Sequence, residues 1–245
     1  MIDLKDDSQL IRRLGSYEYP LYEEGLRANM KRFLGYQTVV LDAGCGPRTK
    51  FFLGLPQSAW AIGLDIDREN VEEAKKTSEG NTSLIVSSLQ NLPFIEEALD
   101  LIICCDVLEH VRDPHKAIGE LAMALRKGGI ILITTTNVLN PAMLIDIRFS
   151  KLSKMLTKRF DSTIFHERRH RFSPWTLAKE IRKYGLMMNL NMFGDPPIGR
   201  PWLVNFQGIS LPKIYYLWIV FDKLTNIKIL KKFKEMMLAV IKKPR

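Results

Sequence analysis

Four residues in the first third of the chain have the types and spacing needed to hold a nucleoside. Asp42 ends an apolar run and is followed by Gly44 and Gly46, and Asp65 ends the next apolar run. Glycine lets the backbone approach a ligand closely, and a carboxylate after a second strand can accept hydrogen bonds from both hydroxyls of a ribose. A dinucleotide fingerprint would need glycine where Thr49 stands, and Asp42 would repel phosphates but suits an ammonium group. The pattern therefore indicates a ligand made of adenosine and an amino acid.

A second group of reactive side chains follows an apolar run further along. Asp106 and His110 come directly after residues 99–105, and open α/β sheets bind ligands where their strands end. His110 is a candidate general base for an acceptor that must lose a proton; the alternative is that it only orients its loop. His166 and His170, in the sequence HERRHRF, are candidates for binding the acceptor substrate, or else belong to a solvated loop.

The cysteines are poorly suited to metal binding or covalent chemistry. The chain has three, Cys45, Cys104 and Cys105, too few and too poorly spaced for a disulfide framework or a zinc site. Cys104 and Cys105 end an apolar run, where small apolar packing is expected. We therefore predict no metal site and a cytosolic environment with reduced thiols.

Apolar, β-branched runs that alternate with helical patterns predict a parallel sheet, which must position these side chains. The runs are nearly continuous, as expected for strands covered on both faces. They span residues 38–42, 60–65, 82–87, 99–105 and 130–136. Residues 186–193 and 236–241 are candidates for the last strands.

Two helices have start and stop signals. Asp113 is placed to cap the first, with Pro114 in its first turn, and the glycine pair at 128–129 is expected to end it. His115, on the polar side of this helix, is expected to be solvent-exposed. A second helix is predicted over residues 173–184, where a glycine stops it.

Length and composition predict one globular domain over residues 1–245. The 245 residues are 46% hydrophobic and 26% charged, which excludes collagen-like and wholly disordered classes. The longest uninterrupted apolar run, 214–221, has eight residues, whereas a membrane-spanning helix needs about 20. The acidic amino terminus lacks the pattern of a signal peptide, so we expect a cytoplasmic protein.

The net positive charge of the protein comes entirely from the second part of the chain. Residues 1–150 hold 16 Lys or Arg and 21 Asp or Glu, whereas residues 151–245 hold 20 and 6. This asymmetry indicates a localised surface for an anionic partner. Residues 142–160 predict an inserted basic amphipathic helix, which together with the run 214–221 is expected to form a lid over the acceptor. Its charged face carries three lysines, the lysine cluster: Lys151, Lys154 and Lys158.

Three sequence blocks resemble the class I S-adenosylmethionine-dependent methyltransferases, in the small-molecule branch that includes quinone-biosynthesis enzymes. They are VLDAGCGP at 40–47, GLDID at 63–67 and DLIICCDVLEHVRDPHKAIGELAMALRKGGIILITTTN at 100–137. The resemblance, which covers about residues 36–193, implies S-adenosylmethionine as cofactor. It also implies a Rossmann-like, doubly wound α/β sheet of seven strands, mostly parallel with an antiparallel last strand. The cofactor-binding core would span 36–137, followed by a basic helical insertion at 138–172 and the last strands with an apolar and basic insertion at 173–245.

The resemblance further implies which residues bind the cofactor, all at or just after the ends of predicted strands. They are Asp42, Gly44, Cys45, Gly46, Asp65, Ile66, Ser88, Leu89 and Asp106. The residues of the glycine turn would line the methionine end, Asp65 would hold the ribose, and Ile66 would pack on adenine. Ser88 stands where such families commonly have an acid; its hydroxyl could bond the base, and Leu89 could supply apolar contact and backbone.

Three functions stay open at this point. The favoured one is methyl transfer to a small-molecule or lipid- or saccharide-linked acceptor, with peripheral association with anionic membranes. The others are an RNA or protein methyltransferase, and a non-catalytic cofactor-binding protein that docks through its basic part. The Pro-Cys pair of cytosine-C5 methyltransferases is missing, as is the N/D-P-P-Y/F signature of amino-methylating DNA enzymes after the fourth strand. Nucleic acid is therefore disfavoured as a partner.

Overall fold

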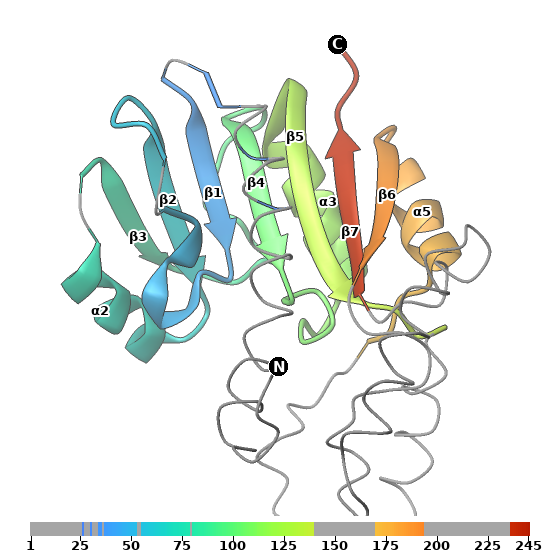
Figure 1. Ribbon diagram of the computed structural model, residues 1–245, viewed down its shortest axis with the longest axis horizontal. Coiled ribbons are helices and arrows are strands. Elements are labelled where there is room, and N and C mark those ends of the chain that lie inside the picture. The colour runs from blue at the N-terminus through green and yellow to red at the C-terminus, as the bar shows by residue number, and fades with distance from the viewer. Residues whose placement is uncertain are drawn as a thin grey trace, which may run out of the picture.

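Seven strands of the computed structural model form one mixed sheet, in the order β3-β2-β1-β4-β5-β7-β6 (Figure 1). The structure describes Leu26, Met30 and residues 34–35, 37–52, 55–78, 80–139, 170–193 and 236–245. The strands are β1 (Val39–Ala43), β2 (Trp60–Asp65), β3 (Thr82–Val86), β4 (Leu99–Cys105), β5 (Leu125–Thr136), β6 (Met187–Phe193) and β7 (Met236–Lys242). The described helices are α2 (Arg68–Thr77), α3 (Pro114–Ala124) and α5 (Pro174–Arg182), with short 3-10 turns η1 (Gly46–Arg48) and η2 (Lys50–Phe52).

The pairing of the strands brings the carboxyl ends of the parallel strands to one edge of the sheet, the carboxyl edge. β1 pairs in parallel with β2 and β4, β2 with β3, and β4 with β5. β7 runs antiparallel between β5 and β6. Because the parallel strands point the same way, their carboxyl ends meet along the lower edge in Figure 1. The predicted fold class, a mostly parallel seven-stranded sheet with an antiparallel last strand, is confirmed.

Both faces of the sheet are covered by apolar packing. Neighbouring residues of a strand point to opposite faces. In β1, Leu41 belongs to the same buried cluster as Leu121 of α3 and Leu177 of α5, whereas Val40 belongs to a second cluster with Leu26. Full burial of such a side chain contributes about 1.5–3 kcal/mol. This two-sided burial explains why the strand sequences are apolar throughout.

The first predicted helix ends earlier than expected. α3 ends at Ala124, and Leu125 already has the extended conformation of β5 while its N–H donates to Leu121 O. Gly128, with φ of 77°, lies inside β5 instead of ending the helix. The pairing of β5 with β4 shifts register between Leu99 and Leu101, so the glycine pair accommodates an irregular start of the strand. The predicted helix end at 128–129 is therefore wrong.

The first turn of α3 is fastened to α5 by a buried carboxylate. Glu180 Oε2 contacts His115 Nδ1 at 2.9 Å and Lys183 Nζ at 2.7 Å, and Tyr184 Oη donates to His115 O at 3.0 Å. Burial would raise the pKa of Glu180, but the hydrogen bond from Lys183 and the charge of His115 outweigh it and hold that pKa below its ordinary value. His115 is exposed, as predicted, but its ring also contacts Glu180 and so joins the two helices.

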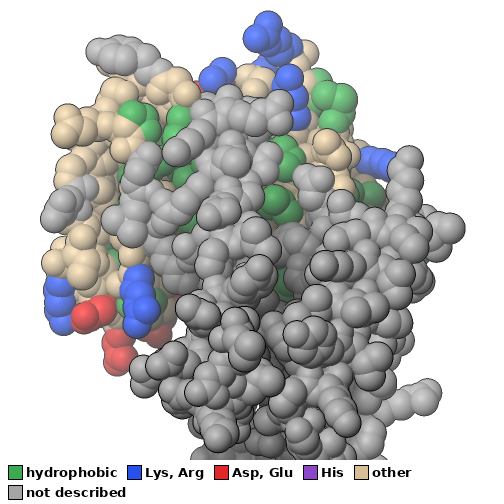
Figure 2. All heavy atoms as spheres, in the orientation of Figure 1, with side chains coloured by type: hydrophobic (Ala, Val, Ile, Leu, Met, Phe, Trp, Pro, Cys, Tyr) green, Lys and Arg blue, Asp and Glu red, His purple; other side chains and the backbone are tan. Residues whose placement is uncertain are grey.

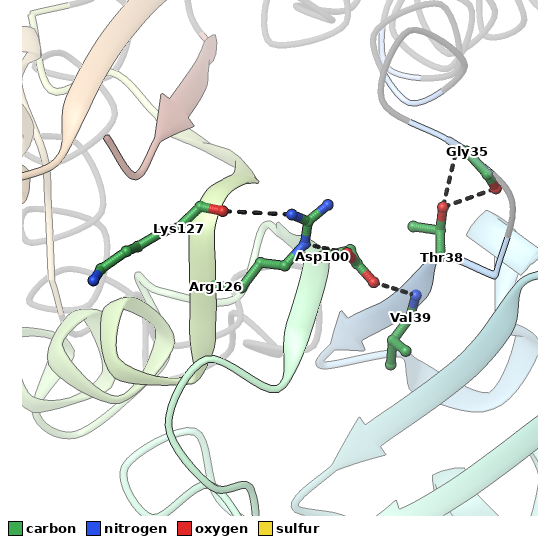
Figure 3. Close-up of polar contacts among 6 residues, drawn as sticks. All are labelled: Gly35, Thr38, Val39, Asp100, Arg126 and Lys127. Atoms are coloured by element: carbon green, nitrogen blue, oxygen red, sulfur yellow. Dashed lines mark hydrogen bonds and ion pairs between the residues drawn. The ribbon is translucent and has the colours of Figure 1, made fainter. Parts of the chain in front are cut away.

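Asp100 joins the amino ends of three strands, at the edge of the sheet opposite the carboxyl edge (Figure 3). Its Oδ2 accepts from Val39 N of β1 at 2.7 Å, and its Oδ1 accepts from Nε of Arg126 in β5. The exposed basic residues of this region are Arg126 and Lys127 at the start of β5, and Lys242 and Arg245 at and after the end of β7. Figure 2 shows Lys and Arg side chains at the upper edge and also at the lower left. Arg48 and Arg112, in the turns after β1 and β4, are exposed as well, so the described basic residues lie at both edges of the sheet.

Several predicted features fall outside the described residues. They include the basic helix at 142–160 with its lysine cluster, the apolar run 214–221 and His166. Among the described helices, none is long and apolar enough to cross a membrane.

Candidate active site

The loop after β1 brings the first predicted residues to the carboxyl edge of the sheet. Asp42, in β1, is only 1% exposed. The next turn is pinned to β2, because the N–H groups of Gly44 and Cys45 both donate to Leu64 O, at 2.7 and 3.0 Å. Gly44 has φ of +86°, and a Cβ there would lie 2.4 Å from Cγ2 of Val107. Only glycine fits this position without displacing the neighbouring loop.

Asp65 reaches from the end of β2 to the same turn. Its Oδ2 accepts from Gly46 N at 2.9 Å, and its Oδ1 accepts from Asp67 N at 2.9 Å and from Asn70 Nδ2 at 3.4 Å. A carboxylate offers about four acceptor positions, so after these three bonds about one position remains for a ribose hydroxyl. A Cβ at Gly46 would meet no atom of the described residues within 4 Å. Open space therefore adjoins a fixed carboxylate, while Asp67 caps α2.

The glycine turn, residues 44–46, lies beside two negatively charged side chains. Burial, aided by the charges of Asp42 and Asp65, raises the pKa of the Cys45 thiol from 9.0 to about 12. Burial also raises the pKa of Cys104. Both thiols are protonated at neutral pH, and since the thiolate is the reactive form, neither is a nucleophile. Two carboxylates at this turn instead favour a ligand with a cationic group.

Exposed apolar side chains lie beyond Asp65. Ile66 is 73% exposed, and Val86, which pairs with Asp65 in the sheet, is 43% exposed. Such a surface beside a hydrogen-bonding carboxylate suits a flat heterocycle attached to a ribose. Ser88 Oγ accepts from the backbone N–H two residues further on, at 3.2 Å, and its O–H can still donate. The side chain of Leu89 packs in the core, so it presents no apolar surface to solvent.

The turn after β4, residues 106–112, wraps around the end of β5. Asp106, with φ of 56°, donates its N–H to Thr134 O at 3.0 Å and accepts from Thr134 Oγ1 at 3.1 Å. Glu109 is 1% exposed and accepts from Thr135 Oγ1 at 3.0 Å. Because neighbouring residues of a strand point to opposite faces, the two threonines hold the turn from both sides. His110 lies half-buried in this turn, its N–H donating to the carbonyl three residues before it at 2.9 Å.

His170 lies beside the same turn. Its backbone N–H donates to Glu109 O at 3.0 Å, and its Nε2 is 2.9 Å from Arg112 O. A carbonyl oxygen only accepts, so Nε2 carries the proton and the ring is held by the protein itself. His170, predicted to bind the acceptor, is therefore at the site but engaged in an internal contact.

The structure thus joins the predicted residues of β1, β2 and β4 along one edge, and adds residues that the sequence analysis missed. These hold the turns in place: Val107, Glu109, Thr134, Thr135 and Arg112. The one available signal was the run of three threonines at 134–136, which closes an otherwise apolar strand. Polar residues there must find partners in the turns that cross the sheet edge.

A family model described as a methyltransferase domain matches residues 41–133. This match runs from within β1 to within β5 and includes the turns after β1, β2 and β4. The chain carries a class I S-adenosylmethionine-dependent methyltransferase domain. The methyltransferase domain includes Asp42 and Asp65, the two acids that define the predicted cofactor site.

Curated relatives of the methyltransferase domain act on different kinds of acceptor. A ubiquinone biosynthesis O-methyltransferase of Actinobacillus pleuropneumoniae is 32% identical over 128 residues, 49% of this chain and 55% of the relative. A tRNA (carboxymethyluridine(34)-5-O)-methyltransferase of Arabidopsis thaliana is 38% identical over 100 residues, 40% of this chain and 24% of the relative. The chain thus spans about half, or less, of the length of these relatives.

Solved structures share the fold of the methyltransferase domain. A SAM-dependent methyltransferase from Archaeoglobus fulgidus superposes with a TM-score of 0.59 at 19% identity, over 91% of this chain and 92% of that chain. Phosphoethanolamine N-methyltransferase 2 of Haemonchus contortus, in complex with S-adenosyl-L-methionine, gives a TM-score of 0.59 at 17% identity, over 89% of this chain and 52% of that chain.

Proposed function

We propose that this chain transfers a methyl group from S-adenosylmethionine to a small-molecule or lipid- or saccharide-linked acceptor. The observation that carries the proposal is the contact between Asp65 and the glycine turn, 2.9 Å from Oδ2 to Gly46 N. It links the ends of β1 and β2 at a turn that lies beside two carboxylates, within the methyltransferase domain. When bound, S-adenosylmethionine supplies an electrophilic methyl group on a sulfonium centre.

The residues present fit this cofactor. Open space beside Gly46 leaves room for a ligand next to the Asp65 carboxylate, which would accept from a ribose hydroxyl. Asp42 lies by the glycine turn and would attract the ammonium group and the sulfonium charge. Ile66 offers the exposed apolar surface for adenine, and the Ser88 hydroxyl would donate to the base. Leu89 would contribute its backbone, because its side chain is buried.

The turn after β4 would form the transfer end of the site. Asp106 borders it at the end of β4, and His110 follows within the same turn. Methyl transfer is an in-line displacement, so the main task of these residues is to align the acceptor and exclude water. His110 would accept a proton where the acceptor must lose one.

An RNA acceptor is the second candidate, because the Arabidopsis relative is named as a tRNA methyltransferase. Exposed basic side chains occur at both edges of the sheet, with Arg48 and Arg112 in the turns of the proposed site. A cofactor-binding protein without catalysis is the third. The predicted peripheral membrane association and the lid stay predictions, since their residues are outside the described part of the chain.

Labelled S-adenosylmethionine and fractionated cell extract test the proposal. We expect wild-type protein to move label into the lipid or small-molecule fraction. Label in RNA or in protein would show that the acceptor belongs to that class instead. Cofactor binding without transfer of label to any fraction would show that the protein is not catalytic. Salt adds a second criterion, because RNA binding weakens steeply as salt rises, whereas insertion of an apolar surface does not.

A further inference from the structure

The chain leaves the sheet and returns to it at one corner of the site. Asn137, at the end of β5, forms a parallel bridge with Phe172, and Val138 N donates to Phe172 O at 2.9 Å. Figure 1 shows the chain after β5 and the chain before α5 meeting at this corner. Residues 140–169 lie outside the described chain, and the described segments on either side of them, 137–139 and 170–172, lie side by side.

His170 is the first described residue after that segment, and it makes two hydrogen bonds to the turn. Its backbone N–H donates to Glu109 O at 3.0 Å, and its Nε2–H donates to Arg112 O at 2.9 Å. The two acceptors lie on either side of His110 in sequence. Any displacement of His170 is thus transmitted to the peptide units that flank His110.

Residues of β5 also hold the turn, from the side of the sheet, whereas His170 holds it from the other side. Thr134 and Thr135 of β5 bond the carboxylates of Asp106 and Glu109 at 3.1 and 3.0 Å. Both threonines are fully buried. The turn is therefore held between the end of β5 and His170.

We propose that His170 is a positioning residue, which sets the place of His110 by fastening the turn at 106–112 to the segment that leads from His170 into α5. The inference rests on the proposed function only for its catalytic consequence, since the contacts exist without it. The Nε2–H of the His170 ring donates to Arg112 O, so this donor acts on the turn.

Histidine NMR tests this inference without any acceptor. The chain has four histidines, so the signals of ring-labelled protein can be assigned by single substitutions, with His110→Gln identifying His110. Asp106 and Glu109 precede His110 in the same turn, and the titration midpoint of the His110 ring should therefore respond to changes in the geometry of this turn. We expect His170→Ala to shift this midpoint by about half a pH unit or more. His170→Gln, whose amide nitrogen reaches nearly as far as Nε2, should restore it.

Two controls separate positioning from general stability. Ser173→Ala removes the cap of α5, whose side chain accepts from Thr176 N at 3.1 Å, and should cost about 1 kcal/mol. It has no contact with the turn among those described, so the His110 midpoint should stay as in wild type. If His170→Ala fails to fold, His170→Asn replaces it, because the shorter side chain cannot reach Arg112 O.

An unchanged His110 midpoint in the folded His170 variants would overturn the inference. So would an equal shift in Ser173→Ala, or a shift that His170→Gln does not reverse. If methyl transfer is found, His170→Ala should lower kcat by up to about 10²-fold with cofactor affinity unchanged. A missing transfer activity with the expected NMR shifts would reject the proposed function and leave the positioning role standing.

Discussion

The two glycines of the turn after β1 should respond in opposite ways to the same substitution. In Gly44→Ala the new Cβ would lie 2.4 Å from Val107 Cγ2, at a φ of +86°. The left-handed conformation costs roughly 1–2 kcal/mol for a non-glycine residue, and overpacking costs about 1–3 kcal/mol. Gly44→Ala should therefore lower the free energy of unfolding by about 2–5 kcal/mol.

Gly46→Ala is the matched control. Its Cβ would meet no atom of the described part of the chain within 4 Å, at a φ of +59°, so the backbone cost of about 1–2 kcal/mol is the main loss. The added methyl group would instead occupy the open space beside Asp65. Affinity for S-adenosylmethionine should fall about tenfold or more, which corresponds to about 1.4 kcal/mol, although the protein remains folded.

Urea denaturation and titration calorimetry with S-adenosylmethionine measure both effects. The double variant Gly44→Ala/Val107→Ala removes the clashing atoms, so its stability should exceed that expected from adding the two single effects. If Gly44→Ala is as stable as Gly46→Ala, or if the double variant shows no coupling, the close contact between Gly44 and Val107 is not what requires glycine. If Gly46→Ala binds like wild type, the cofactor does not occupy that space.

Asp65→Ala should weaken cofactor binding by about 1.5–3 kcal/mol, because a charged hydrogen-bonding partner is lost; unchanged affinity in calorimetry would remove Asp65 from ribose binding. His110→Ala should lower turnover about 10²-fold with little change in cofactor affinity, and an unaltered rate would make His110 structural. With a pKa of about 12, the Cys45 thiol should resist iodoacetamide at pH 8 in native protein and react in urea, as read by mass spectrometry; equal rates would contradict its burial. Reversing the lysine cluster to glutamate should abolish flotation with anionic vesicles, each lysine contributing about 1 kcal/mol, whereas wild type that stays soluble at low salt would refute the membrane prediction.

Most strands could be predicted from the sequence because two-sided burial leaves an unbroken apolar run. β2 and β4 begin and end where their runs do, and β1 is displaced by one residue. β5 begins five residues before its predicted start at 130, because glycine at 128–129 is compatible both with a helix end and with an irregular strand. Only the contact of this segment with Leu99 in β4 decides between the two.

The ends of β1 and β2 could be predicted as a site because an acid and glycines interrupt an apolar pattern there. The contacts that shape the site could not be predicted from the sequence. Val107 against Gly44, and His170 against Arg112, join residues that are 63 and 58 positions apart in sequence. They depend on how loops cross the sheet edge, which no local periodicity encodes. The predicted roles of the site residues in binding remain predictions.

One radiolabel experiment decides whether a methyl group leaves S-adenosylmethionine at this site. The full chain is incubated with methyl-labelled S-adenosylmethionine and fractionated cell extract, beside Gly46→Ala as the folded variant with impaired cofactor binding. We predict label in the lipid or small-molecule fraction with wild type, and a loss of about tenfold with Gly46→Ala at cofactor concentrations below saturation. Label that stays on S-adenosylmethionine in every fraction, or transfer that is equal in both proteins, would contradict methyl transfer at the carboxyl edge of this sheet.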